Sequence, residues 1–205
     1  MDIPKHKVFI SYYHAEDQNY KNALIGASDL FKDCSVHEDE VDADDNMTDE
    51  QIRREIRDKY ISDATVLLLL CGRHTKERKY IDWEIQAAMT DYDNNPKMGI
   101  VVVNLPSIKG LQKVRSVFGE EDKQYFPSIA WVSASNDYST LKEEYPYLPE
   151  RIVKNMTRND VKISIIDWEQ FSQYSMRLKG LIDVAFNHRK EQDYDISEKL
   201  RRRNS

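Results

Sequence analysis

Apolar runs and segments of helical periodicity alternate along the first half of the chain. Three continuous runs, Lys7–Ser11 (KVFIS), Ala64–Cys71 (ATVLLLLC) and Gly99–Val103 (GIVVV), are typical of strands that are covered on both faces. Between them lie segments whose apolar residues recur at the spacing of an amphipathic helix. The pattern therefore predicts repeated strand–helix units, which build a parallel sheet with helices on both faces.

The segments between these strands contain signals for helix starts. The first helix is expected to begin with Asp17 as its cap, and its inward face is Tyr20, Ala23, Leu24, Ala27, Leu30 and Phe31. Cys34–His37 (CSVH) has the pattern of a second, weaker strand. Thr48 and Gln51 have the spacing of a capping box, which predicts the start of the second helix. A third helix is expected over Thr75–Tyr92.

The pattern is less regular in the second half of the chain. Residues 105–160 are predicted to form an insertion, in which Tyr138–Tyr147 is polar and irregular and Pro149 opens a short helix. Lys162–Trp168 predicts a fifth strand, and an amphipathic helix is expected from Glu169 to Lys190. Residues 1–190 are thus predicted to form one α/β domain, a flavodoxin-like three-layer sandwich with a five-stranded parallel sheet of order 2-1-3-4-5. Residues 191–205 are expected to be a frayed, flexible tail.

One carboxylate, Glu84, lies on an apolar helix face within the third predicted helix. On a helical wheel of Tyr80–Met89 (YIDWEIQAAM), only Asp82 and Gln86 fall outside a wide, mostly apolar arc, and Glu84 lies near its middle. A carboxylate in such a place must be paired, neutralised or used. Two interpretations are open, a buried structural ion pair and a functional group.

The predicted sheet order places Glu84 near a second group of polar residues. In open α/β sheets, ligands bind beyond the carboxyl ends of the strands where the strand order switches, here between the first and third strands. Tyr12, Tyr13 and His14 follow the first strand, and the turn after the third strand leads into the helix of Glu84. Both segments therefore point to one cleft.

The composition narrows the range of partners. With 30 Lys plus Arg against 36 Asp plus Glu the net charge is −6, which disfavours nucleic-acid binding. The longest apolar run, Ala64–Cys71, is too short to span a bilayer, and no signal peptide is expected because Met1–Lys7 leads directly into a strand. Cys34 and Cys71 match no metal spacing and are expected to be buried thiols. A cytoplasmic protein without nucleic-acid or membrane partners is predicted.

Two ligand-binding interpretations of the acidic residues are disfavoured. The acidic loop Glu38–Asn46 (EDEVDADDN) offers alternating oxygens as an EF-hand does, but it lacks the mid-loop Gly and the bidentate Glu at the twelfth position. A response-regulator receiver would need an acidic cluster after the first strand and an Asp at the end of the third. This chain has Ser11-Tyr12-Tyr13 and Cys71-Gly72 at these places. Neither calcium binding nor phosphoryl acceptance is expected.

A single carboxylate without a metal or a second acid suits a restricted class of reaction. Most hydrolyses need a group that protonates the leaving group. Nicotinamide instead leaves NAD⁺ as a neutral molecule from a cationic pyridinium, so a carboxylate that binds the ribose hydroxyls and stabilises an oxocarbenium-like centre is sufficient. The aromatic residues around Glu84 are suited to stacking on the nicotinamide or adenine rings, and His14 to a phosphate contact.

These residues carry a family resemblance. The opening KVFISYYHAED, an acidic loop after the second strand and KYIDWEI on the third helix resemble bacterial TIR-like domains, especially those of the Thoeris anti-phage defence system. The resemblance covers Lys7 to about Asn104 and, more loosely, the last strand and helix. It implies a TIR fold, a catalytic Glu at Glu84, and cleavage of NAD⁺ to nicotinamide and a cyclic ADP-ribose isomer. It further implies that this product activates a downstream effector, and that NAD⁺ is a substrate, with no cofactor required.

The resemblance also suggests substrate contacts and self-association. The candidate substrate-binding residues are Ser11, Tyr12, Tyr13, His14, Asp45, Tyr80 and Trp83. Many relatives have Trp four residues before the Glu, where this chain has Tyr80, and a basic residue after the first strand, where only His14 is available. Relatives commonly complete the site through TIR–TIR contacts, which would turn Asp44, Asp45 and Asn46 toward a neighbouring subunit. A non-catalytic TIR-like interaction module is the alternative function.

The individual candidates also have structural interpretations. Tyr12 and Tyr13 are equally typical of packing at the rim of a sheet, and Ser11 of a side chain that satisfies a strand-end amide. Trp83 is as typical of a core residue as of a stacking surface, and His14 of an exposed turn. Only the positions of these side chains in the folded chain can separate the interpretations.

Overall fold

The structure is a computed structural model that describes residues 5–26, 30–34, 46–61, 63–92, 95–127, 137–172 and 175–204. Its centre is a parallel sheet of five strands in the order β2-β1-β3-β4-β5. The strands are β1 (Lys7–Ser11), β2 (Lys32–Asp33), β3 (Val66–Cys71), β4 (Gly99–Asn104) and β5 (Ser164–Asp167). The predicted α/β class and strand order are confirmed.

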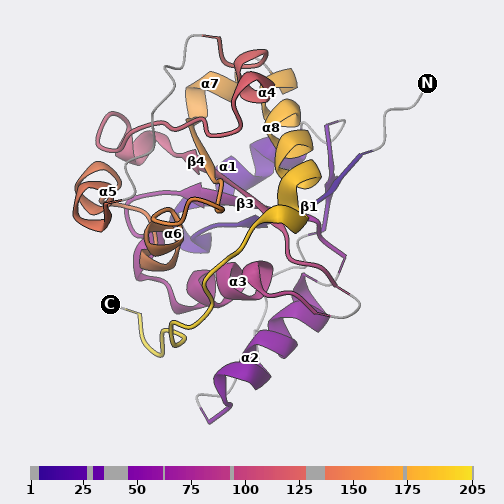
Figure 1. Ribbon diagram of the computed structural model, residues 1–205, viewed down its shortest axis with the longest axis vertical. Helices are drawn as coiled ribbons and strands as arrows, with labels where there is room; N and C mark the ends of the chain where they lie inside the picture. The colour runs from indigo at the N-terminus through magenta and orange to yellow at the C-terminus, as the bar shows by residue number, and fades with distance from the viewer. Residues whose placement is uncertain are drawn as a thin grey trace.

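Helices cover both faces of the sheet (Figure 1). They are α1 (His14–Gly26), α2 (Asp49–Glu55), α3 (Lys79–Met89), α4 (Glu120–Lys123), α5 (Tyr138–Glu144), α6 (Glu150–Asn155), α7 (Trp168–Ser172) and α8 (Ser175–His188). Shorter turns of helix span Ile56–Tyr60, Thr75–Glu77, Pro106–Ile108 and Arg189–Glu191. One apolar core joins the sheet to α2, α3 and α6, and the other joins it to α1 and α8. No helix among the described residues has the length and apolar character needed to cross a membrane.

The local sequence signals differ in how well they place the elements. The capping box at Thr48 and Gln51 is present, with Thr48 N donating to Gln51 Oε1 at 2.8 Å and Gln51 N to Thr48 Oγ1 at 3.2 Å. The second strand is at Lys32–Asp33 and precedes the predicted Cys34–His37; Cys34 N still donates to Val8 O, and residues 35–37 lie outside the described residues. In the insertion, α6 begins after Pro149 as predicted, whereas α5 was not expected.

The end of the chain is placed differently from the prediction. Residues 192–204, called here the C-terminal strap, run along α3 and α6 (Figure 1), where Tyr194 is 8% and Leu200 4% exposed. The Tyr194 hydroxyl donates a hydrogen bond to Met98 O, and Asn155 Nδ2 donates one to Asp195 O. The expectation of a frayed, solvated end beyond Gln192 is therefore wrong for these residues, because two apolar side chains and several backbone groups have partners in the body of the protein.

Candidate active site

Glu84 and Ser11 meet where the sheet order switches. Ser11 is the last residue of β1, and β1 is hydrogen-bonded to β2 on one side and to β3 on the other. Glu84 lies in the middle of α3, and its side chain is buried. Ser11 Oγ donates to Glu84 Oε2 at 2.6 Å, a short hydrogen bond between two buried groups. The predicted convergence of the β1 end and the Glu84 helix is therefore present, and the bond fixes the orientation of the carboxylate.

The two-residue period of β1 decides which neighbours share this face. Phe9 belongs to the core on the α3 side, whereas Ile10 and Tyr12 belong to the core on the α1 and α8 side. Successive side chains of a strand point to opposite faces, so Ser11 and Tyr13 are turned toward α3 and Tyr12 away from it. The three candidates that follow one another in sequence are thus divided between the two layers.

Tyr12 and His14 lie on the α1 side. Tyr12 is 4% exposed, and its hydroxyl donates to Gln18 Oε1 at 2.7 Å. His14 is the exposed first residue of α1, and its Nδ1 lies 3.2 Å from the Tyr12 hydroxyl. The structure therefore does not place the Tyr12 ring beside Glu84, and the packing interpretation applies to this residue.

Tyr13 carries a basic neighbour that the sequence argument missed. The guanidinium of Arg78 lies over the Tyr13 ring, 4.0 Å from its centre, in the geometry of a cation–π contact. The loop after β1 was expected to have only His14 as a basic group. Arg78 comes from the segment before α3, so its proximity depends on the pairing of β1 with β3. In the sequence, the basic neighbour of Tyr13 is indicated only by the cluster of positive charges at Lys76, Arg78 and Lys79.

The start of α3 explains how Arg78 reaches Tyr13. Thr75 Oγ1 accepts from Gly72 N at 2.7 Å and donates to Leu70 O at 3.3 Å, so the chain forms a short turn of helix over Thr75–Glu77. Arg78 is then extended, with φ −91° and ψ 121°, and α3 begins at Lys79. The predicted single helix over Thr75–Tyr92 is therefore wrong at both ends. At the start, the hydrogen bonds of the Thr75 side chain compete with a continuous helix. At the other end, α3 stops at Met89.

The C-terminal strap occupies the face of α3 that was expected to meet solvent or substrate. Trp83 is 0% exposed, and its Nε1 donates to Arg201 O at 2.7 Å. Gln86, placed on the polar side of the wheel, is also buried and donates to Ile196 O at 2.8 Å. The indole of Trp83 is thus part of the core in this structure, where it is covered by the strap and is not exposed for stacking.

Tyr80 remains accessible at the edge of this region. It is 37% exposed, and its ring meets that of Trp83 edge-on with the ring centres 5.1 Å apart. Lys79 Nζ lies 5.1 Å from the centre of the Tyr80 ring. Asp45, the candidate from the acidic loop, lies outside the described residues together with Asp44.

Asp17 has a different place from the cap that the sequence indicated. Helix α1 begins at His14, so Asp17 lies within its first turn, buried against Gly72 at the end of β3. A Cβ atom on Gly72 would lie only 2.8 Å from Asp17 Oδ2, which leaves no space for a side chain there. Burial, together with the Glu16 carboxylate, raises the pKa of Asp17 to about 6.

The raised pKa of Asp17 predicts a specific pH dependence of stability. The ordinary value is 3.8, so between about pH 4 and pH 6 the native state binds more protons than the unfolded state. The free energy of unfolding should therefore fall as pH rises through this window. Asp17→Asn, which stays neutral, should be more stable than the natural protein at pH 7 by about 2 kcal/mol.

Urea denaturation of both proteins at a series of pH values from 4 to 7 measures this difference. The stability curves should converge near pH 4 and separate above pH 5. Curves that stay parallel over the whole range would show that Asp17 titrates normally, because only a group with a shifted pKa changes the slope.

The groups at this site can stabilise a positive charge and bind an anionic ligand. The site offers one buried carboxylate held by a hydroxyl and, on the same side of the sheet, a tyrosine ring under a guanidinium. A carboxylate in a water-poor site stabilises a developing positive charge more strongly than it would in water. A guanidinium nearby suits the phosphate groups of a nucleotide.

A comparison with family models adds an independent result. Residues 9–110 match the model of the family described as the Thoeris protein ThsB, TIR-like domain. This stretch runs from β1 to the beginning of the insertion and contains Ser11, Arg78 and Glu84. No curated protein matches the chain.

Proposed function

Because residues 9–110 place the chain in the family of Thoeris ThsB TIR-like domains, we propose that it cleaves NAD⁺ at Glu84. The reaction releases nicotinamide and forms a cyclic ADP-ribose isomer, which acts as a signal to a downstream effector in anti-phage defence in the cytoplasm. The observation that carries the proposal is the hydrogen bond between Ser11 Oγ and Glu84 Oε2 at the switch in strand order. It links the family's expected catalytic carboxylate to the loop expected to bind the nucleotide.

The chemistry requires little beyond this carboxylate. Nicotinamide departs as a neutral molecule, and the Glu84 carboxylate binds the ribose hydroxyls while positive charge develops at the anomeric carbon. In cyclisation a nucleophilic group of the same molecule attacks that carbon and loses a proton; in hydrolysis water takes this part. Ser11 is a positioning residue, since it holds the carboxylate and has no role in bond making. Tyr13 and Arg78 are the proposed contacts for the rest of the nucleotide.

Turnover by the purified protein tests the proposal. The full chain, at high concentration to favour TIR–TIR assembly, is incubated with NAD⁺, and products are separated by chromatography and identified by mass spectrometry. Nicotinamide and a product with the mass of ADP-ribose less water are expected. Absence of turnover at every concentration tried would contradict the proposal.

The hydrogen bond itself predicts the effect of Ser11→Ala. Loss of the hydroxyl leaves the carboxylate without one of its orienting contacts, so nicotinamide release should fall by about tenfold or more through kcat. The fold should persist, because a methyl group fits the buried site of the hydroxyl. Steady-state kinetics with Ser139→Ala, an exposed serine in α5, provide the matched control. An unchanged kcat in Ser11→Ala would remove the positioning role.

A second function is favoured by the burial of Glu84. Glu84 is 8% exposed, and it does not line the pocket between α5, α6 and the C-terminal strap or the smaller pocket beside it. A TIR-like module that only assembles with other TIR domains would need no access to this carboxylate. Phage protection assays distinguish the two functions, because a Glu84→Gln variant that still protects cells would support the module without catalysis.

A further inference from the structure

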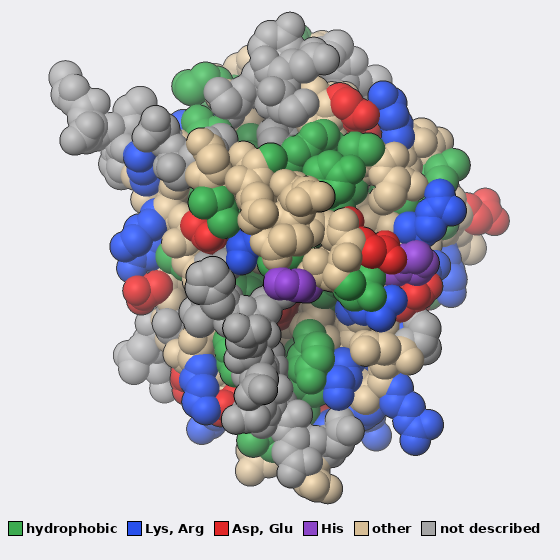
Figure 2. All heavy atoms as spheres, turned by 180° about the vertical axis from the view of Figure 1, so that it is seen from behind, with side chains coloured by type: hydrophobic (Ala, Val, Ile, Leu, Met, Phe, Trp, Pro, Cys, Tyr) green, Lys and Arg blue, Asp and Glu red, His purple; other side chains and the backbone are tan. Residues whose placement is uncertain are grey.

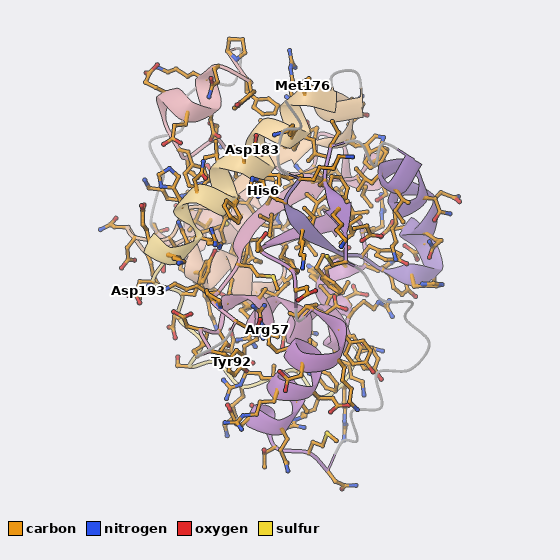
Figure 3. All side chains as sticks on the ribbon, turned by 90° about the vertical axis from the view of Figure 1, so that its right-hand side faces the viewer. His6, Arg57, Tyr92, Met176, Asp183 and Asp193 are labelled. Carbon is orange, nitrogen blue, oxygen red and sulfur yellow. The ribbon has the colours of Figure 1, made fainter. Side chains whose placement is uncertain are left out.

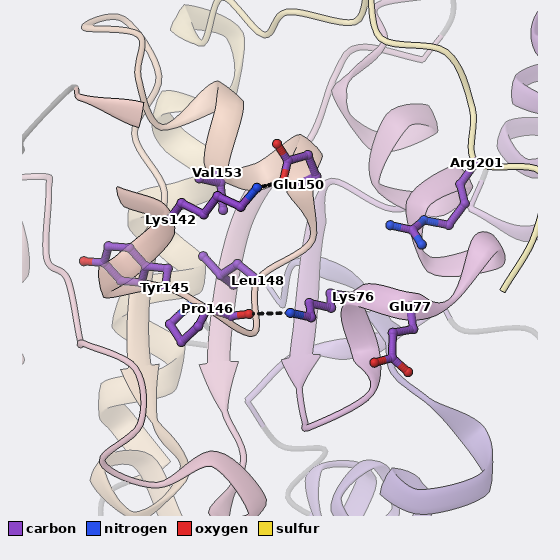
Figure 4. A pocket seen from close by; sticks show the side chains of 9 residues that line it. All are labelled: Lys76, Glu77, Lys142, Tyr145, Pro146, Leu148, Glu150, Val153 and Arg201. Atoms are coloured by element: carbon purple, nitrogen blue, oxygen red, sulfur yellow. Dashed lines mark hydrogen bonds and ion pairs between the residues drawn. The ribbon is translucent and has the colours of Figure 1, made fainter. Parts of the chain in front are cut away.

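A pocket lies outside the candidate active site, between the loop after β3, the helices α5 and α6, and the C-terminal strap (Figure 4). Its volume is about 400 Å³, within the range of small-molecule sites. Tyr145, Leu148 and Val153 form its apolar part. A smaller pocket of about 130 Å³ adjoins it and shares the side chains of Lys76, Glu150 and Arg201. Glu84 lines neither of them.

Three cationic side chains from separate segments meet at this pocket. Lys76 comes from the turn after β3, Lys142 from α5 and Arg201 from the strap, and Figure 4 shows them around one opening. Lys76 Nζ donates to Pro146 O at 2.8 Å. This acceptor is a neutral backbone carbonyl, so the contact does not neutralise the charge of the lysine. Like charges placed together are unfavourable unless an anion offsets them.

Two carboxylates also line the pocket, but both have cations or donors beyond it. Glu77 Oε2 lies 3.7 Å from Arg78 Nη2. Glu150 accepts a hydrogen bond from Tyr138 and lies 4.0 Å from Lys154 Nζ and 3.9 Å from Lys142 Nζ. The contact of Glu150 with Lys142 is long for an ion pair, so it competes weakly with a bound anion. The pocket as a whole favours an anionic group beside an apolar surface.

Arg201 connects this pocket to the helix of Glu84. Its backbone N donates to Asp82 Oδ2 at 2.9 Å, and its backbone O accepts from Trp83 Nε1 at 2.7 Å. The same residue thus holds the first turn and the middle of α3 with its backbone, while its side chain lines the pocket. A ligand that binds the Arg201 side chain would restrain the strap at the point where the strap holds α3.

We propose that this pocket binds a small phosphorylated molecule, whose phosphate is held by Lys142 and Arg201 and whose apolar part lies against Leu148. Binding stabilises the contact of the strap with α3, and it changes the environment of the Trp83 indole, which donates to Arg201 O. The pocket is not lined by Ser11, Tyr13 or Glu84, whereas Arg78 lines the smaller pocket beside it. Its occupancy does not depend on NAD⁺ cleavage.

Calorimetric titration of the full chain with pyrophosphate and with ADP tests the proposal, and adenosine serves as the uncharged comparison. Both phosphorylated probes should bind saturably, whereas adenosine should not. Arg201→Ala and Lys142→Ala should each weaken binding by about tenfold, the effect of losing one charge-assisted contact. Arg203→Ala, an exposed arginine on the same strap, should bind as the natural protein does.

An NMR titration adds a structural readout. The indole N–H resonance of Trp83, assigned through Trp83→Phe, should shift on addition of pyrophosphate because the bond from Nε1 to Arg201 O lies beside the site. Arg201→Ala could also weaken binding by loosening the strap. Lys142→Ala provides a second test without this effect, because Lys142 is an exposed residue of α5 and is not part of the strap.

Three results would overturn the proposal. The first is no binding of pyrophosphate at millimolar concentration, and the second is unchanged affinity in both Arg201→Ala and Lys142→Ala. The third is binding that is lost in Ser11→Ala but kept in these two variants, which would assign the probes to the candidate active site. Failure of NAD⁺ turnover is a different outcome, because it leaves pyrophosphate binding to the pocket unaffected.

Discussion

Glu84→Gln should abolish nicotinamide release from NAD⁺ while leaving the fold intact. The amide has the size of the carboxylate, and its oxygen can still accept the hydrogen bond from Ser11 Oγ. It carries no negative charge, so it cannot stabilise the positive charge that develops at the ribose. Loss of one electrostatic contact of this kind costs about a hundredfold or more in kcat. Nicotinamide release measured by chromatography gives the rate.

The matched control for this variant is Glu143→Gln, which neutralises an exposed carboxylate on α5. Its rate should equal that of the natural protein, and both variants should elute alike in size-exclusion chromatography if assembly is preserved. A rate in Glu84→Gln within a fewfold of the natural rate, with normal assembly, would remove Glu84 from the chemistry.

Asp82→Ala should destabilise the protein by about 3–5 kcal/mol, the cost of breaking a buried ion pair on one side. Arg151 is 1% exposed and donates to both oxygens of Asp82, through Nε to Oδ1 at 2.9 Å and through Nη2 to Oδ2 at 3.0 Å. The variant leaves this guanidinium buried without a carboxylate from Asp82, although it still donates to the backbone carbonyls of Glu198 and Lys199. Urea denaturation measures the loss.

Two further proteins make the Asp82 result interpretable. Asp82→Ala combined with Arg151→Met should recover much of the lost stability, because a methionine fills the space without leaving a charge. Lys109→Ala, which breaks the exposed pair with Glu169, should change stability by less than about 1 kcal/mol. If Asp82→Ala costs no more than Lys109→Ala, the buried pair does not hold α6 and the strap to α3.

Hydrogen exchange gives a local readout of the same variant. Leu200 N and Arg201 N donate to Asp49 Oδ2 and Asp82 Oδ2, both at 2.9 Å. Loss of Asp82 should raise the exchange rate of the Arg201 amide directly and that of its neighbours through loosening of the strap. The effect should remain small in the central strands β3 and β4, which are buried along their whole length.

The features predicted correctly are those that a short stretch of sequence encodes. The runs of β3 and β4 are apolar at successive positions because both faces are covered, and this pattern is local. The Thr48 and Gln51 capping box needs only a spacing of three residues. The strand–helix alternation then restricts the topology to a few parallel arrangements, of which the order 2-1-3-4-5 is the one present.

The candidate site was predictable in part for the same reason. The position of Glu84 on an apolar helix face follows from its helical period, and the predicted sheet order brought that helix to the end of β1. The two-residue period of β1 also distinguishes Ser11 and Tyr13 from Tyr12, which belongs to the core on the other side of the sheet. The site contact between Ser11 and Glu84 is thus consistent with patterns that are visible in the sequence.

The sequence by itself therefore determined the sheet, its order and the burial of Glu84, whereas the tertiary structure decided the surroundings. The strap on Trp83, the placing of Arg78 over Tyr13 and the pairing of Asp82 with Arg151 join segments far apart in the chain. Hydrophobic periodicity records only whether a position is buried, and it does not identify the segment that buries it. Polar contacts between distant segments depend on the packing of the whole chain, so they leave no local pattern.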